Sequence, residues 1–182
     1  MVPSTFGNLK TNRSYQQSMA VALTTAVNFS EMKISSNPAE TLVAFTIGSG
    51  IGMTIYDPIS MVGGMLNFIL PSSATIDSAK IKKKPFMFAD TAIPLFLATL
   101  EELGAKADRM KIVIAGGAQV LDQTGVFNIG HHNYQATQLI LSGYKLGIHH
   151  EDIGGVQSRT LKLNIGSGDS FIHFPGQREK KI

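Results

Sequence analysis

One stretch, residues 41–71, constrains the fold more than any other part of this 182-residue chain. Two apolar runs, Leu42–Ile47 and Ile51–Tyr56, flank the glycine-rich turn Gly48-Ser49-Gly50, and a third run, Met65–Leu70, follows. Alternating β-branched and aromatic residues bounded by Gly and Pro are typical of strands joined by tight turns. We therefore expect a strand, a sharp reversal and a hairpin in which the second and third runs pair antiparallel.

That pairing brings the Gly50 end of one strand close to the Asn67–Leu70 end of the next. A nucleophile in the turn and a base on the returning strand would meet there. Ser49 is a candidate nucleophile, but no base is visible in this stretch, because Asn67 cannot accept a proton as histidine does. Only the tertiary structure can show whether His173 or another histidine approaches Ser49.

The remaining segments predict single helices between groups of strands. Helices are expected over Phe88–Leu103, started by Asp90 or Thr91, and over His131–Ser142. The apolar face of the second helix is expected to contain Ala136, Leu139 and Ile140. Further strands are expected over Lys111–Ala115, Leu146–His149, Arg159–Ile165 and Ser170–Phe174, the last two forming a hairpin.

Since strands outnumber helices, the fold class is α+β or α/β, a layered sandwich of mixed β-sheets flanked by helices. We expect one domain over residues 30–175. Residues 1–29 are expected to be an extension that is partly disordered, although residues 21–28 fit a strand or a short helix. Residues 71–85 should form an exposed loop, and residues 176–182 a polar tail.

The composition excludes several classes of protein. Hydrophobic residues make up 43% and charged residues 16% of the chain, as in ordinary globular proteins. The absence of cysteine excludes disulfides, thiolate metal sites and a cysteine nucleophile. No apolar run is long enough for a membrane-spanning helix, so no membrane insertion is expected, and a cytoplasmic location fits.

The net charge of +3 is unevenly distributed. Positive charge is concentrated in Lys80, Lys82, Lys83 and Lys84 and in the tail 178–181, while the rest of the chain is net negative. These segments are either simply solvated or attract an acidic partner. Nucleic-acid binding is not favoured, because no aromatic stacking motif accompanies the lysines.

Two further motifs suggest nucleotide or metal binding but do not fit either. The glycine-rich turn at residues 48–52 lacks the Gly-Lys-Ser/Thr ending of a phosphate loop and the spacing of a dinucleotide fingerprint. The pairs His131-His132 and His149-His150 are adjacent in sequence, so the two rings of each pair point in different directions. We therefore expect neither a metal nor a cofactor.

Several short motifs in one order resemble the CheD family, the chemoreceptor glutamine deamidases of bacterial chemotaxis. The first two are T-x-G-S-x-I-G-x-x-x-Y-D-P at residues 46–58 and G-G-M-x-x-F-x-L-P at residues 63–71. The others lie at residues 89–92, 101–105, 114–118, 128–133 and 151–155 and at Arg159. The resemblance spans Glu31 to Ile172 and implies a CheD-like fold.

The family's reaction uses a cysteine nucleophile, a histidine base and an assisting threonine. The resemblance places these three functions at Gly50, Asn67 and Ala44, none of which carries the required side chain. Glycine offers no nucleophile and asparagine no titratable nitrogen. We therefore expect a non-catalytic binding protein whose partners, by resemblance, are the cytoplasmic helices of chemoreceptors or a CheC-like phosphatase.

Two alternatives remain open. The chain could be an amidohydrolase with a replacement nucleophile such as Ser49. It could also have an unrelated activity, because one fold supports several functions.

Overall fold

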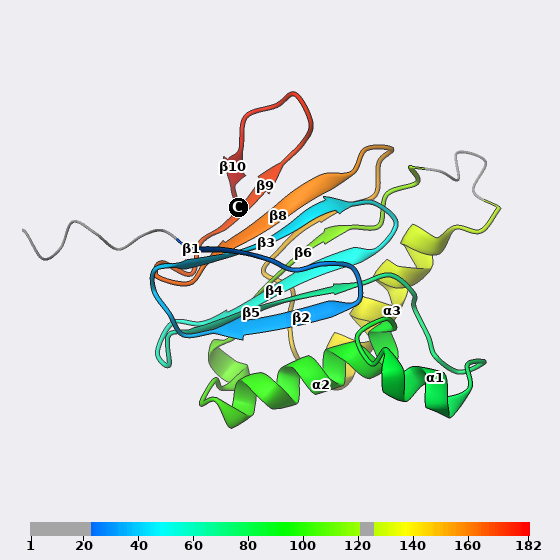
Figure 1. Cartoon of the computed structure of the whole chain (residues 1–182), viewed down its shortest axis with the longest axis horizontal. Coiled ribbons are helices and arrows are strands. Elements are labelled where there is room, and N and C mark those ends of the chain that lie inside the picture. The colour runs from blue at the N-terminus through cyan, green and yellow to red at the C-terminus, as the bar shows by residue number, and fades with distance from the viewer. Residues whose placement is uncertain (1–22, 121–125) are drawn as a thin grey trace, which may run out of the picture.

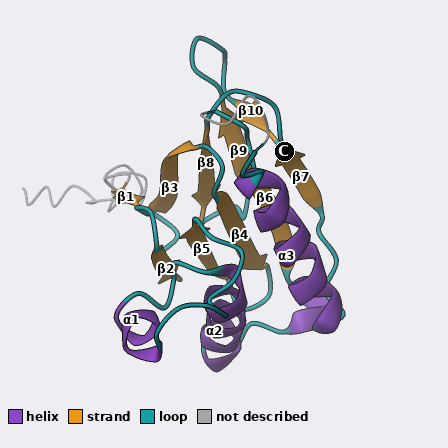
Figure 2. Cartoon of the chain, turned by 90° about the vertical axis from the view of Figure 1, so that its right-hand side faces the viewer, coloured by secondary structure: helices purple, strands orange, loops and turns teal. Residues whose placement is uncertain are grey.

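The computed structural model describes residues 23–120 and 126–182, which form three layers: two stacked β-sheets and one layer of helices. Figure 1 shows the helices below the sheets, on the side of the sheet that contains β2, β4 and β5, and Figure 2 shows them at the bottom and along the right-hand side of the sheets. The predicted fold class, a layered α+β sandwich with mixed sheets, is confirmed.

The outer sheet has the strand order β1-β3-β8-β9-β10. Its strands are β1 (Leu23–Ala26), β3 (Glu40–Ile47), β8 (Arg159–Asn164), β9 (Ser170–His173) and β10 (Lys180–Lys181). The expected hairpin is confirmed, because β8 and β9 pair antiparallel. For residues 21–28 the sequence left a strand or a short helix open. The structure has the strand β1 there, which runs parallel to β3.

The inner sheet has the strand order β2-β5-β4-β6-β7. Its strands are β2 (Glu31–Ser35), β5 (Val62–Phe68), β4 (Ile51–Asp57), β6 (Lys111–Gly116) and β7 (His150–Ile153). Every residue of β4 and β5 is buried, because both faces of this sheet are covered. The antiparallel pairing of β4 with β5 is the one predicted from the sequence.

Two apolar layers separate these three parts. One lies between the inner sheet and the helices α2 (Ala89–Glu102) and α3 (Ile129–Gly143), where Phe68 and Phe96 are fully buried. The other lies between the two sheets and includes Ala44 and Ile47. The short helices α1 (Ser78–Lys83) and η1 (Ala107–Arg109) contribute no buried residue to either layer.

The prediction that Asp90 or Thr91 caps the start of the first long helix was wrong. α2 begins after Phe88, which makes no side-chain capping bond. Asp90 instead accepts hydrogen bonds from the backbone N–H of Ser73 at 2.7 Å and from the hydroxyl of Ser72 at 2.9 Å. The Asp90 carboxylate therefore stabilises the loop after β5 and does not cap the start of α2.

Three other local predictions were also wrong. The predicted loop at residues 71–85 contains the short helix α1. Asp77 caps the start of this helix by accepting a hydrogen bond from the N–H of Ala79 at 2.8 Å. The strand predicted at 146–149 starts at His150, where pairing with Val113 of β6 begins. On α3, Leu139 is 76% exposed, because the side of this helix that faces the sheets is partly polar.

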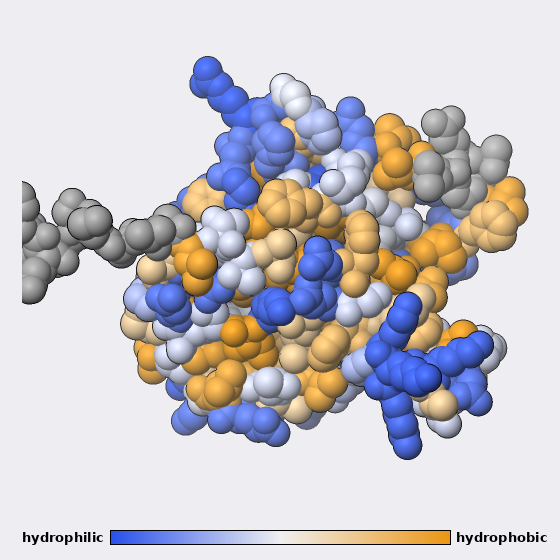
Figure 3. All heavy atoms as spheres, in the orientation of Figure 1, coloured by the Kyte–Doolittle hydropathy of each residue, from blue (hydrophilic) through white to orange (hydrophobic). Residues whose placement is uncertain are grey.

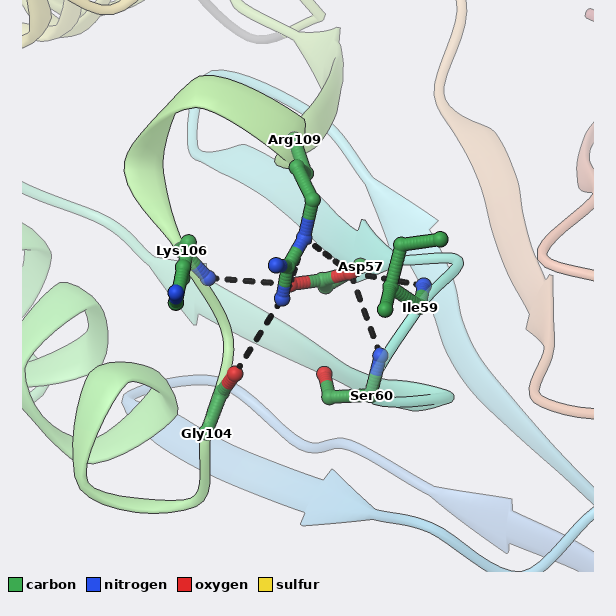
Figure 4. A network of polar contacts seen from close by, with 6 residues as sticks. All are labelled: Asp57, Ile59, Ser60, Gly104, Lys106 and Arg109. Atoms are coloured by element: carbon green, nitrogen blue, oxygen red, sulfur yellow. Dashed lines mark hydrogen bonds and ion pairs between the residues drawn. The ribbon is translucent and has the colours of Figure 1, made fainter.

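At the far end of β4, a buried carboxylate fixes the turn into β5 (Figure 4). Asp57 accepts hydrogen bonds from the backbone N–H groups of Ile59, Ser60 and Lys106 and from the Arg109 guanidinium, whose closest nitrogen is 2.5 Å away. Burial alone would raise the pKa of Asp57, but these donors outweigh it and hold the pKa well below its usual range.

The predicted boundaries at residues 29, 30 and 175 remain predictions. Leu23–Ala26 belongs to the outer sheet and Lys180–Lys181 pairs with β9, so both flanking segments contribute strands. Residues 1–22 of the predicted extension lie outside the described residues. Within the described part of the chain, no helix is long and apolar enough to span a membrane.

Candidate functional site

The turn 48–50 connects the two sheets, because it follows β3 of the outer sheet and precedes β4 of the inner one. The register of β4 with β5 places Ile51 opposite Phe68 and Gly52 opposite Asn67. Gly50 therefore precedes the first paired residue of β4 and lies beside the residues that follow β5, as the sequence predicted.

Of the three positions singled out by the family resemblance, only Gly50 lines a cleft. The cleft, here called the Gly50 cleft, has a volume of about 570 Å³. Its polar lining residues are Thr46, Ser49, Gln119 and Ser158, and its apolar ones include Phe29, Ile69 and Ile129. It has the size and the apolar character common in sites that receive a small molecule or a side chain.

Asn67 and Ala44 lie deeper, between the two sheets. Asn67 is 1% exposed, and its Nδ2 donates a hydrogen bond to the carbonyl of Val27 at 3.3 Å. Its Oδ1 has no hydrogen-bond partner among the described residues. Ala44 is fully buried in the apolar layer that also contains Val27. Neither residue lines the Gly50 cleft, so Asn67 does not present its amide there.

The backbone at Gly50 leaves no room for a side chain. A Cβ atom on this residue would lie 2.6 Å from the carbonyl oxygen of Phe68 and 3.4 Å from Cγ2 of Ile69. The carbonyl of Gly50 also accepts a hydrogen bond from the N–H of Gly117 at 2.8 Å, which holds it against the end of β6. A cysteine at this position would require the backbone of β4 or β5 to shift.

Asn133 of α3, the last residue of the family-like motif at 128–133, was not predicted as a site residue, and it holds this region together. Its Nδ2 donates to the carbonyl of Ser49 at 2.8 Å and to the carbonyl of Ile69 at 3.0 Å. The side chain is fully buried, and its Oδ1 has no partner among the described residues. A polar residue on the face of a helix that packs on a sheet is the signal that could have identified it.

Ser49, the candidate replacement nucleophile, is exposed and lines the Gly50 cleft. No histidine is among the described residues that line this cleft. His131 lines a neighbouring pocket of about 340 Å³ together with Gln119, Asn128 and Tyr134. His173 belongs to β9, where it pairs with Thr160. Ser49 thus lies in the cleft, and among the described residues that line this cleft there is no histidine to act as its base.

The other histidines do not gather into a ligand set. The rings of His131 and His132 are 6.2 Å apart between centroids, and Nδ1 of His149 accepts a hydrogen bond from the N–H of Ile112 at 3.1 Å. Within residues 23–120 and 126–182, no group of three or more potential metal ligands comes together.

The loop after β7 forms one side of this end of the molecule and is held by a buried arginine. Arg159 donates to the carbonyls of Asp152 at 2.7 Å and Gln157 at 3.1 Å, and also pairs with the Asp152 carboxylate. Burial lowers the pKa of Arg159, and the negative charge of Asp152 opposes this effect. Its guanidinium carbon lies 5.1 Å from the centre of the Phe174 ring. Arg159 therefore supports the loop and does not face the Gly50 cleft.

A family profile described as "CheD chemotactic sensory transduction" matches residues 69–174. Among curated proteins, the chain is 38% identical to a "Probable chemoreceptor glutamine deamidase CheD" of Solibacter usitatus, over 86% of this chain and 92% of that protein. It is 39% identical to a protein with the name "Probable chemoreceptor glutamine deamidase CheD 1" of Syntrophus aciditrophicus, over 82% of this chain and 93% of that one. A protein of Desulforamulus reducens, also a "Probable chemoreceptor glutamine deamidase CheD", is 36% identical over 86% of the chain.

These similarities cover the strands, the helices and the loop after β7 rather than one local motif. Both the matched profile and the identity over most of the chain agree with the order of motifs found in the sequence. The chain belongs to the CheD family.

Proposed function

We propose that this chain is a non-catalytic member of the CheD family that binds a partner of the chemotaxis system at the Gly50 cleft. Its relatives are named as probable deamidases of chemoreceptor glutamines, which supports the cytoplasmic part of a chemoreceptor as the partner. A CheC-like phosphatase is the alternative partner, proposed from the family resemblance alone. The chemistry of the three proposed triad positions supports binding over reaction.

The observation that carries this proposal is the backbone at Gly50. The residue lacks a nucleophile, and a Cβ there would meet the Phe68 carbonyl oxygen at 2.6 Å. Asn67 has no titratable nitrogen and donates its amide to Val27 inside the protein. Ala44 has no hydroxyl. Without a nucleophile and a base, no covalent intermediate of the family's reaction can form.

The test is incubation of the purified chain with a glutamine-bearing chemoreceptor fragment, with binding followed by calorimetry and ammonia release measured in parallel. The relative from Solibacter usitatus, treated in the same way, shows whether the fragment is a usable substrate. We expect heat of binding but no ammonia from this chain. Ammonia release that disappears when a residue of the Gly50 cleft is changed would overturn the proposal.

The second candidate, a hydrolase with Ser49 as nucleophile, is supported by the exposure of Ser49 in the cleft. A serine-directed covalent probe tests it, with Ser49→Ala as the matched control. Labelling of the folded chain that is lost in S49A would favour this candidate over the binding protein. We expect no difference in labelling, because no histidine lines the cleft in the part of the chain that the structure describes.

A further inference from the structure

The two basic segments of the sequence differ in how their charges are satisfied. In the C-terminal tail, Lys181 forms an ion pair with Asp169 at 2.8 Å, and Glu179 pairs with Lys162. The lysines at 80, 82, 83 and 84 are all exposed, and none forms an ion pair with another described residue. The charge of the tail is thus partly neutralised within the fold, whereas the charge of α1 is not.

The lysine cluster of α1, defined as Lys80, Lys82, Lys83 and Lys84, contributes little to the stability of the domain. α1 has no buried residue, and Asp77 caps its start. Lysines in a last helical turn interact favourably with the helix dipole, but neighbours three and four residues apart repel one another by a similar few tenths of a kcal/mol. The stability of the fold therefore does not explain why four of the five residues at 80–84 are lysines.

The position of α1 connects this cluster to the Gly50 cleft. The chain leaves the inner sheet after β5 and returns at Met87, whose carbonyl accepts from the N–H groups of Ile69 at 3.2 Å and Leu70 at 3.1 Å. Ile69 itself lines the cleft. The segment that carries the lysines is therefore anchored at both ends beside one wall of the cleft.

Figure 3 shows the same arrangement on the surface. Hydrophilic side chains project at the lower right, where Figure 1 places α1, and apolar residues gather above them at the same end of the molecule. Phe29, a lining residue of the cleft, is 58% exposed. An exposed aromatic side chain at the edge of an apolar cleft is a common feature of surfaces that bind a partner.

We propose that the lysine cluster of α1 and the Gly50 cleft form one docking surface for a partner protein segment that carries acidic residues beside a large apolar side chain. The carboxylates would face the lysines, and the apolar side chain would enter the cleft. This inference rests on the proposed binding role of the cleft and adds to it the chemistry of the partner.

The same features argue against other occupants. Single-stranded nucleic acid binds through successive aromatic residues and arginines along a basic groove, whereas the basic part of this surface, the lysine cluster, contains neither, and Phe29 lies at the apolar cleft instead. A membrane-surface helix needs a continuous apolar face, whereas α1 has six residues, of which only Ala79 and Ile81 are apolar. Charge complementarity therefore favours acidic side chains of a protein.

The experiment uses an array of short peptides in which one Phe or Leu is placed at varied distances from a run of glutamates, tested against the full chain by fluorescence anisotropy. Arrays with the apolar residue removed, or with Lys in place of Glu, serve as controls. We expect the best acidic-apolar peptides to bind about tenfold more tightly than acidic peptides without the apolar residue, with affinity falling as salt is raised. Equal binding of the acidic-only peptides, or of heparin or anionic vesicles, would overturn the inference.

Two variants separate this inference from the proposed function. K82E/K83E reverses the cluster, and R178E/K180E changes the net charge equally in the tail. We expect only the first to weaken the selected peptide, by about tenfold, and to abolish its salt dependence. S49W fills the cleft and should abolish binding.

Three outcomes have distinct meanings. If S49W abolishes binding but K82E/K83E acts no more strongly than R178E/K180E, the cleft binds and the docking role of α1 is refuted. If K82E/K83E abolishes binding and S49W does not, the lysines bind on their own and the combined surface is refuted. If no variant matters, the proposed function and the inference both fail.

Discussion

The two ends of β4 differ in how completely their buried polar groups are hydrogen-bonded. At the Asp57 end, a fully buried carboxylate accepts hydrogen bonds from three backbone N–H groups and from a guanidinium. At the Gly50 end, a cleft opens, and the buried Oδ1 atoms of Asn67 and Asn133 have no partner among the described residues. The first arrangement gives a buried charge several hydrogen-bond donors and leaves the Ser60 hydroxyl without a partner among the described residues, while the second leaves two amide oxygens and an open cleft. This contrast within one strand agrees with the proposal that the partner binds at the Gly50 end.

The largest expected effect is at the Asp57 end. Asp57→Ala removes the acceptor of the Arg109 guanidinium and of three backbone donors, so we expect a loss of about 3 kcal/mol in the free energy of unfolding. Urea denaturation followed by circular dichroism measures it. Arg109→Met should cost less, because the Arg109 side chain is 25% exposed while that of Asp57 is fully buried. A loss below about 1 kcal/mol in D57A would contradict the central role of this carboxylate.

The same carboxylate predicts how stability depends on pH. Because the folded protein holds the pKa of Asp57 well below its ordinary value, protons bind this group more readily in the unfolded chain. Its contribution is fully present above about pH 4 and is lost as the pH falls from there toward the folded pKa. Acid denaturation of the wild type and of Asp57→Asn should show a steeper loss of stability for the wild type below that pH. Parallel curves would contradict the assignment.

At the Gly50 end, Asn133 is expected to have the largest effect. Asn133→Leu keeps the branched shape in a somewhat larger apolar side chain and leaves the carbonyls of Ser49 and Ile69 without their donor, at a cost of about 2 kcal/mol. Thr137→Val, one turn further along α3, removes a single hydrogen bond to the Asn133 carbonyl and is the matched control. Hydrogen exchange at residues 49–52 should accelerate in N133L and not in T137V. Equal exchange in both would mean that Asn133 does not hold the turn.

Restoring the family's side chains is the next largest test. Gly50→Cys places a Cβ against the Phe68 carbonyl oxygen, so we expect a loss of about 2 kcal/mol from the required backbone shift. The chain has no other cysteine, so thiol reagents report this position alone. Ser49→Cys, one residue earlier and exposed, should react quickly, whereas the G50C thiol should react slowly.

The triple variant A44T/G50C/N67H completes this test. We expect no ammonia release from a glutamine-bearing receptor fragment, because the nucleophile would lack the backbone geometry that its reaction needs. Full activity together with unchanged stability would show that only side chains were lost, and that the Gly50 end retains the shape of an active site.

The sequence predicted the pairing of β4 with β5 and the place of Gly50, because alternation and turn residues determine local strand geometry. It could not predict that Asn67 turns away from the cleft toward Val27, since that depends on where the residues after β1 lie relative to β5 in the three-dimensional structure. It also assigned an apolar face to α3 that includes Leu139, because periodicity cannot show that Asn133 is needed by two carbonyls on distant strands. The spacing of apolar residues along the sequence therefore does not predict long-range polar contacts of this kind.

The smallest predicted effect concerns Thr46, at the irregularity in β3 that leads into the turn. Its φ of 54° is in the left-handed region, which is costly for a β-branched residue. Thr46→Gly should therefore stabilise the protein by about 1 kcal/mol, with the loss of strain partly offset by the greater entropy of glycine in the unfolded chain. Thr46→Ala keeps the left-handed backbone strained and should gain less. If T46G instead destabilises the protein, Thr46 stores no strain, and the Gly50 end differs from the Asp57 end in its cleft and in the unpartnered amide oxygens of Asn67 and Asn133.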